Sequence, residues 1–135
     1  MNNTSIIDLA IEAVGQLING LNPFAPIRRG ALGADHGLCC EPAPSSVEEV
    51  YLDKGYYLPL TLGINGKHAN LQILSATLNN IQDTLSRLRT YPTGNGWEIV
   101  DITSGISPRV IGREENNDWL MACDLVIKIH RKDDE

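Results

Sequence analysis

Residues 119–130, WLMACDLVIKIH, carry apolar side chains at every second position. Side chains alternate between the two faces of an extended strand, so one face of this segment is continuously apolar. That face consists of Trp119, Met121, Cys123, Leu125, Ile127 and Ile129. The other face carries Asp124, Lys128 and His130, with Leu120, Ala122 and Val126 among them. The pattern predicts a strand near 119–131 that places one side against a hydrophobic core.

Other segments with the same alternation predict further strands. In YYLPLTLGI the even-numbered residues from Tyr56 to Ile64 share a face, which predicts a strand near 56–64. Pro59 points to the other face and has no N–H donor, which indicates an edge position or a bulge. ALGADHGLCCE, WEIVDIT and PRVIGR predict strands near 32–41, 97–104 and 108–113.

Two segments have the three- and four-residue spacing of amphipathic helices. The first lies near 4–20, where a broad apolar face is opposed by the polar stripe Ser5, Asp8, Glu12, Gln16 and Asn19. The second is a long helix near 67–90, with the apolar stripe Leu71, Leu74, Leu78, Ile81, Leu85 and Leu88. Tyr91-Pro92 ends it, because the residue before a proline disfavours helix. The regular apolar stripe of this second helix is also compatible with a coiled coil. A single helix that lies between strands in the sequence more often packs on a sheet.

The order of these elements predicts the fold class. A helix is followed by two strands, the long helix and three more strands, and each helix has one apolar stripe. Both helices can therefore cover the same face of one mostly antiparallel sheet. We expect an α+β two-layer sandwich in a single domain over residues 1–135.

The amino-acid composition argues against some classes of function and indicates the cellular compartment. The net charge of -6 argues against binding to duplex nucleic acid through a basic face, because phosphate neutralisation supplies most of that affinity. Three cysteines, two of them adjacent, fit a reducing compartment better than a disulfide framework. The apolar N-terminal segment has no basic start, and Asp8 and Glu12 interrupt it, so neither a signal peptide nor a membrane span is predicted. We expect an intracellular, soluble protein without sequence-specific nucleic-acid binding or a membrane partner.

Cys39, Cys40 and His36 are the residues that most invite a metal or thiol interpretation. In a strand over 32–41, Cys39 and Cys40 point to opposite faces, and His36 lies about 13 Å from Cys40 at about 3.3 Å per residue. One metal ion cannot bind all three at such separations. Cys123 lies on the apolar face of the last strand, where a free cysteine packs as a small hydrophobe.

No other motif in the sequence brings together a nucleophile, a base and an oxyanion donor, or forms a phosphate-binding loop. We expect His68 and His130 at the surface, and the carboxylate pairs Glu48-Glu49 and Glu114-Glu115 solvated in polar loops. The sequence therefore predicts no catalytic, cofactor-binding or metal-binding residues, no cofactor and no enzymatic activity.

Residues 55–131 contain a combination of segments that resembles a known protein class. A long helix ends in YP at 91–92, WEIVDITSGISPRVIGRE follows at 97–114, and NNDWLMACDLVIK follows at 116–128. The matching pieces are 97–102, Ser107-Pro108 with Ile111, and Trp119 leading into the final strand. This combination resembles the small minor capsid proteins of Gram-positive phages and prophages, which are similar to the tail terminator proteins of long-tailed phages. The segment PAPSSVEEVYLDKG at 42–55 and the Cys39-Cys40 pair do not match the family pattern.

The resemblance implies a structural role in a virion. Its subunits form a ring, typically a hexamer, which caps the finished tail tube, stops its polymerisation and presents a surface to the head. The implied partners are further copies of the chain, the tail tube protein and the head-tail connector protein. The implied location is the tail or neck of the virion, and the cytoplasm of the bacterial host during assembly.

Such a subunit needs complementary patches for its neighbours and loops that become ordered on docking. Residues 21–33 and 41–55 are candidates for those loops, and an acidic lumen would let DNA pass without sticking. Two other functions fit the sequence less well. The first is a head-tail adaptor or another α+β assembly or binding module. The second is a small thiol enzyme that uses Cys39, Cys40 or His36.

Overall fold

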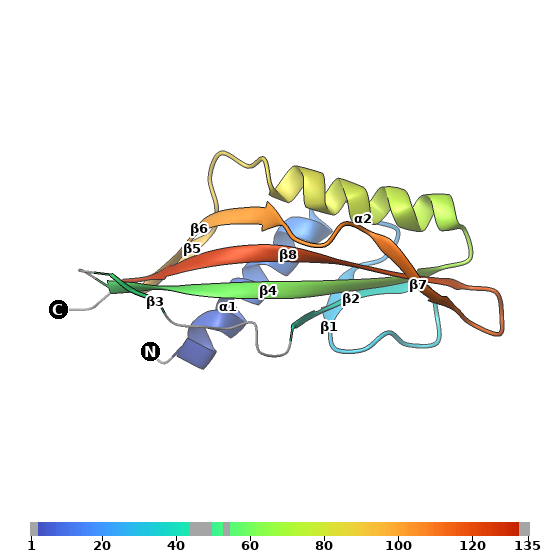
Figure 1. The fold of residues 1–135 in the computed structure, drawn as a ribbon, viewed down its shortest axis with the longest axis horizontal. Helices are drawn as coiled ribbons and strands as arrows, with labels where there is room; N and C mark the ends of the chain where they lie inside the picture. Colours follow the sequence, from blue (N-terminus) through green and yellow to red (C-terminus); the bar gives the residue numbers. More distant parts are fainter. Residues whose placement is uncertain (1–2, 44–49, 53–54, 133–135) are drawn as a thin grey trace.

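The computed structural model describes residues 3–43, 50–52 and 55–132. Within these residues the chain forms two helices and eight strands (Figure 1). In chain order they are α1 (Asn3–Asn19), β1 (Ile27–Arg29), β2 (Gly37–Pro42), β3 (Val50–Leu52), β4 (Gly55–His68), α2 (Leu71–Leu85), β5 (Thr93–Gly94), β6 (Trp97–Ser104), β7 (Arg109–Arg113) and β8 (Trp119–Arg131).

All eight described strands belong to one sheet. The order is β1-β2-β4-β8-β6-β5, with β3 paired to β4 and β7 paired to β8. The neighbours are antiparallel except for β1 and β2, which are parallel. The centre is the long β4–β8 pair, in which Tyr56 to His68 lie opposite Arg131 to Trp119 (Figure 1).

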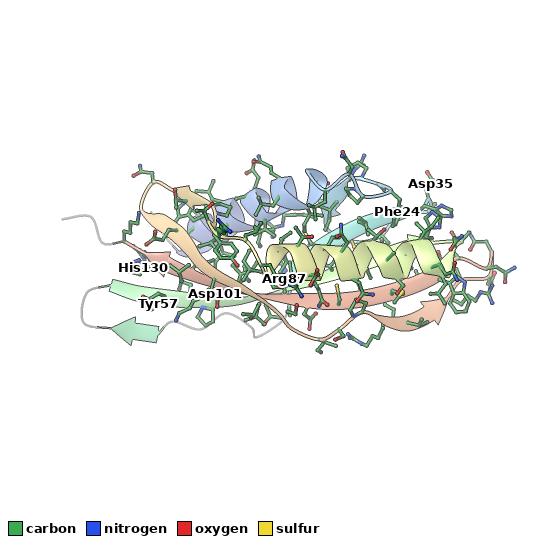
Figure 2. All side chains as sticks on the ribbon, turned by 90° about the horizontal axis from the view of Figure 1, so that it is seen from above. Phe24, Asp35, Tyr57, Arg87, Asp101 and His130 are labelled. Carbon is green, nitrogen blue, oxygen red and sulfur yellow. The ribbon has the colours of Figure 1, made fainter. Side chains whose placement is uncertain are left out.

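Both helices cover the same face of this sheet, which confirms the predicted α+β two-layer sandwich. Figure 2 shows α1 and α2 side by side over the strands. The alternating residues of the two central strands form the sheet side of the core, and each is at most 4% exposed. They are Leu58, Leu60, Leu62, Ile64, Met121, Cys123, Leu125, Ile127 and Ile129. From the helices, Ile6, Ala10, Ile11, Val14, Ile18, Leu74, Leu78, Ile81 and Leu85 complete it.

The long helix is shorter than the expected 67–90. Residues 67 and 68 still belong to β4, where they pair with Leu120 and Trp119 of β8. The helix begins after Asn70, whose Oδ1 accepts a hydrogen bond from the main-chain N–H of Ile73 at 3.1 Å and so caps the first turn. It ends at Leu85, although Leu88 still packs against the core from the segment that follows. Neither described helix combines the length and the hydropathy that crossing a bilayer requires.

The expected strand over 32–41 also differs from the structure. β2 begins only at Gly37, because residues 33–36 form a loop that is held by side chains at the end of the sheet. β1, β3 and β5 have no counterpart among the expected strands, since segments of two or three residues are too short to show alternation. Of the two candidate docking loops, 21–33 contains β1, and 41–55 lies partly outside the described residues.

Pro59 lies within β4, where its position opposite Lys128 of β8 places it inside the long central pair. On the other side of β4, the described pairing with β3 reaches Tyr57 and the described pairing with β2 reaches Leu62.

Candidate interaction surfaces

The three cysteines are buried free thiols. Cys40 lies in the core beneath the helices, whereas Cys39 is buried outside that core, opposite Asn65 of β4 and beside residues 30–32. Burial raises the pKa of the Cys40 thiol to about 11 and that of Cys123 to about 12, and it raises the pKa of Cys39 in the same direction. A protonated thiol is a poor nucleophile and a poor metal ligand at neutral pH.

His36 lies in the loop before β2, and not in the strand with the cysteines. Its Nε2 lies 3.2 Å from Oδ1 of Asp118, and the main-chain N–H of Ala69 donates to the same Nε2 at 3.2 Å. Asp118 is buried and also accepts a hydrogen bond from Nδ2 of Asn116 at 3.3 Å. Across residues 3–43, 50–52 and 55–132, no three His, Cys, Asp or Glu side chains are grouped so that they could hold a metal ion.

His68 lies at the end of β4, half-buried, rather than on an open surface at the start of a helix. Its ring packs against Phe24 edge to face, with ring centroids 4.8 Å apart, and against His36 with centroids 4.3 Å apart. Burial, followed by the charge of His36, lowers the pKa of His68. The three rings come from separate segments, so no local pattern in the sequence could have placed them together.

Lys67 is a buried cation on the face of the sheet turned away from the helices. Its side chain is 4% exposed, and its Nζ lies 2.7 Å from Oε1 of Glu114 and donates to the main-chain carbonyl of Gly33. Glu114 is therefore paired, which corrects the expectation of a solvated carboxylate there. Together with the contact between His36 and Asp118, this ion pair ties the 30–36 loop to the turn between β7 and β8.

We call His36, Lys67, His68, Glu114 and Asp118 the end cluster. It contains the Lys67–Glu114 ion pair, the contact between His36 and Asp118 and one stacked ring pair, and it includes no hydroxyl or thiol nucleophile. Its contacts join the 30–36 loop, the C-terminal end of β4 and the turn between β7 and β8. The arrangement is that of a structural clasp.

Among the described residues, the large hydrophobic side chains with the highest exposure lie on β7 and in the turn before it. Ile106, Val110 and Ile111 are 53%, 48% and 51% exposed. β7 pairs with β8 and, in the part of the chain that the structure describes, with no other strand. The register shifts between Val110 and Gly112, so Ile111 is an extra residue in a bulge. We call the edge formed by Ile106, Arg109, Val110, Ile111 and Arg113 the β7 patch. Arg109 lies opposite Ala122 and Val110 opposite Met121, so these two side chains point to different faces of the sheet.

The outward face of α1 has the opposite charge. Its exposed residues are Ser5, Asp8, Leu9, Glu12, Gln16 and Asn19, which include the predicted polar stripe. The helix contains no Lys, Arg or His between Asn3 and Asn19. Leu9 is 38% exposed between the two carboxylates. Asp8 accepts a hydrogen bond from Nη1 of Arg29 at 2.8 Å, which attaches α1 to the edge strand β1.

The face of the sheet turned away from the helices carries mixed charges. Nζ of Lys128 lies 4.4 Å from the centroid of the Tyr57 ring, and Nδ1 of His130 lies 3.2 Å from Oε1 of Glu98. A shallow groove of about 370 Å³ crosses β4, β6 and β8 there, and Asp101 lines it. Figure 2 shows Tyr57, Asp101 and His130 at the same end of the sheet. His130 is half-buried, and Glu48-Glu49 lie outside the described residues.

Comparison with known proteins shows a shared fold. A scan against models of protein families finds no match, and a search of curated proteins finds none either. Among solved structures, a chain from the virion of a native gene transfer agent particle has a matching fold, with a TM-score of 0.58. The two chains are 15% identical, and the match covers 90% of this chain and 93% of the other.

Proposed function

We propose that this protein is a structural component of a phage-like virion, related in role to tail terminators. In this proposal its subunits form a ring that caps the tail tube and joins it to the head. The observation that carries the proposal is the fold shared with a chain of a gene transfer agent virion over 90% of this chain. Because the match also spans 93% of the other chain, both chains have similar dimensions as well as a similar topology.

The surfaces of the molecule support a function through contacts with other proteins. Val110 and Ile111 on the edge strand β7, and Ile106 in the turn before it, are each about half exposed, and an exposed sheet edge is suited to contact with another chain. The thiols, by contrast, are buried and have raised pKa values, which disfavours the alternative of a thiol enzyme. His36, the third residue of that alternative, is engaged by Asp118 and packs against His68.

The finer assignments follow from the resemblance of 55–131 to minor capsid and tail terminator proteins. They are a ring of six subunits, contacts with the tail tube protein and the head-tail connector protein, and a position in the neck or tail. The proposal includes assembly in the cytoplasm of the bacterial host and does not require a cofactor.

Negative-stain microscopy of the protein with purified tail tubes and, separately, with connectors of the same virion tests this function. We expect rings or added density at one end of the tubes. Binding to connectors without binding to tube ends would instead favour the head-tail adaptor. Failure to bind either assembly would contradict the proposal.

A further inference from the structure

We propose that copies of this chain associate head to tail, with the β7 patch of one copy docked on the outward face of α1 of the next. The inference rests on the proposed function, because it names the contact between neighbouring subunits of the ring.

The β7 patch exposes apolar side chains at an edge of the sheet, where a partner can cover them. Soluble proteins usually protect the edges of their sheets with charges, short strands or covering segments. β7 is short and carries Arg109 and Arg113, yet about half of the surface of both Val110 and Ile111 is exposed, and Ile106 in the turn before it is also exposed. The bulge at Ile111 interrupts regular pairing, so an incoming surface meets side chains as well as main-chain groups.

Pairing of β7 with the same strand of a second copy is disfavoured by charge. In an antiparallel pair centred on Ile111, Arg109 of each copy would lie opposite Arg113 of the other. Like charges directly opposite each other destabilise a sheet. A surface that offers a carboxylate together with apolar contact therefore fits the β7 patch better than a second β7 in this register does.

The outward face of α1 offers both. Asp8 and Glu12 are exposed one turn apart, with Leu9 between them, and the helix carries no basic side chain. A groove of about 540 Å³ runs along this helix beside β1 and can receive a strand or a turn. The β1 wall of the groove carries Arg28 and Arg29, of which Arg29 is already paired with Asp8. Arg113 is already engaged, since its Nε donates to the carbonyl of Asn117 at 3.3 Å and its guanidinium lies over the Trp119 ring. The attraction is therefore between Arg109 and the α1 wall, where Glu12 lies.

The β7 patch and the outward face of α1 lie on different sides of the subunit, so each copy can contact one neighbour through β7 and another through α1. In Figure 2, α1 (blue) and β7 (orange) lie on opposite sides of α2. A contact between two different patches on opposite sides of a subunit is heterologous, and it closes into a ring when the rotation between neighbours allows. A ring of this kind is what the proposed function requires.

Charge reversal tests the pairing directly. We expect Arg109→Glu and Glu12→Arg each to raise the dissociation constant between subunits by roughly tenfold or more. The double variant, which restores opposite charges, should recover much of the loss. Ile111→Asp should dissociate the subunits without rescue by Glu12→Arg. Light scattering and native mass spectrometry across a range of concentrations give the assembly state, and circular dichroism checks that each variant is folded.

Arg87→Glu is the matched control, because Arg87 is exposed just beyond the C-terminal end of α2 and makes its ion pair with Asp83. It should assemble like the wild type. Single reversals at residues 12 and 109 that leave assembly unchanged, or a double variant that is no better than the singles, would overturn the proposed contact. So would a wild-type protein that stays monomeric both alone and on tube ends.

Binding to tail tubes separates this inference from the proposed function. If Arg109→Glu and Ile111→Asp still form rings that cap tubes, the contact is wrong and the proposed function stands. If the variants lose assembly as expected but wild-type rings never bind tubes or connectors, the contact stands and the proposed function fails.

Discussion

The side-chain amide of Gln82 donates a hydrogen bond to the main-chain carbonyl of Asp124 at 2.7 Å, which joins α2 to the central strand β8. The same nitrogen lies 2.8 Å from the carbonyl oxygen of Ile106. Gln82 is 5% exposed, so these bonds form away from water. They hold the helix at the point where β6 ends and the turn into β7 begins. This buried amide therefore links α2 both to β8 and to the turn that leads into the β7 patch.

Replacing Gln82 with Leu should lower the free energy of unfolding by about 1–3 kcal/mol, because buried carbonyls lose hydrogen bonds that an apolar side chain cannot replace. The loss stays moderate because Gly105 and Asp124 still donate main-chain N–H groups to these two carbonyls. Gln72→Leu, at an exposed position of the same helix, should change stability by about 0.5 kcal/mol at most. Chemical denaturation measures both, and equal effects would contradict the role of the amide.

Gly66 allows α2 to approach β4 closely. A Cβ at this position would lie 2.6 Å from Cδ1 of Leu74 and 3.0 Å from Cδ2 of Leu38. Gly66→Ala should therefore destabilise the protein by about 1–3 kcal/mol through overpacking. Gly33→Ala is the control, since no atom lies within 4 Å of a Cβ built there. Thermal unfolding that shows no difference between the two variants would mean that the helix–sheet contact is looser than the structure shows.

Lys67 should hold the 30–36 loop and the β7–β8 turn together. Lys67→Met removes the 2.7 Å ion pair with Glu114, and we expect a loss of about 1–3 kcal/mol. Hydrogen exchange should become faster in both segments, because each loses the same partner. Lys132→Met serves as the control, as its Nζ is 3.9 Å from Glu98 and its side chain is 47% exposed. Unchanged exchange in residues 30–36 would contradict the clasp.

The cysteines predict a fall in stability at high pH. An exposed thiol in the unfolded chain ionises near pH 8.5, whereas the pKa values of Cys40 and Cys123 in the folded protein are about 11 and 12. Above about pH 8.5 the unfolded state therefore binds fewer protons than the folded state, and the free energy of unfolding falls as pH rises. The slope of that free energy against pH should be smaller in Cys123→Ala than in the wild type. Equal slopes would show that burial does not hold this thiol protonated.

Alkylation of the native protein gives an independent test of the same burial. At neutral pH we expect a small alkylating probe to modify none of the three cysteines in the folded state and all of them after denaturation. Rapid modification of Cys39 or Cys40 in the folded protein would reopen the thiol-enzyme alternative. Because Cys39 lies outside the main core, it should be the first to react when the fold is loosened.

The sequence predicted those parts of the fold in which apolar side chains recur at a regular spacing over many residues. The alternation from Trp119 to Ile129 gave the central strand, and the leucine stripe gave α2, because burying one face imposes that period on the sequence. The spacing of the apolar residues could not predict the residues at which α2 begins and ends. A capping residue, Asn70, sets one end, and Lys67 and His68 keep their strand pairing through contacts with β8.

The surfaces were predicted less well than the core, since they depend on residues that are distant in sequence. The polar stripe of α1 was visible because it is local to one helix. The end cluster was not visible, since residues 36, 67, 68, 114 and 118 meet only once the sheet has formed. The exposure of Ile111 was equally hidden, because a short β-strand with isoleucine looks the same in a core and at an open edge.

The length of tail tubes assembled in the presence of this protein tests the central claim most directly. The tube protein of the same virion is polymerised with increasing amounts of the wild-type chain, and tube lengths and ends are measured by electron microscopy. The account predicts that growth stops and that one end of each finished tube carries a ring. Tubes that continue to grow with uncapped ends, at protein concentrations where rings are present in solution, would contradict it.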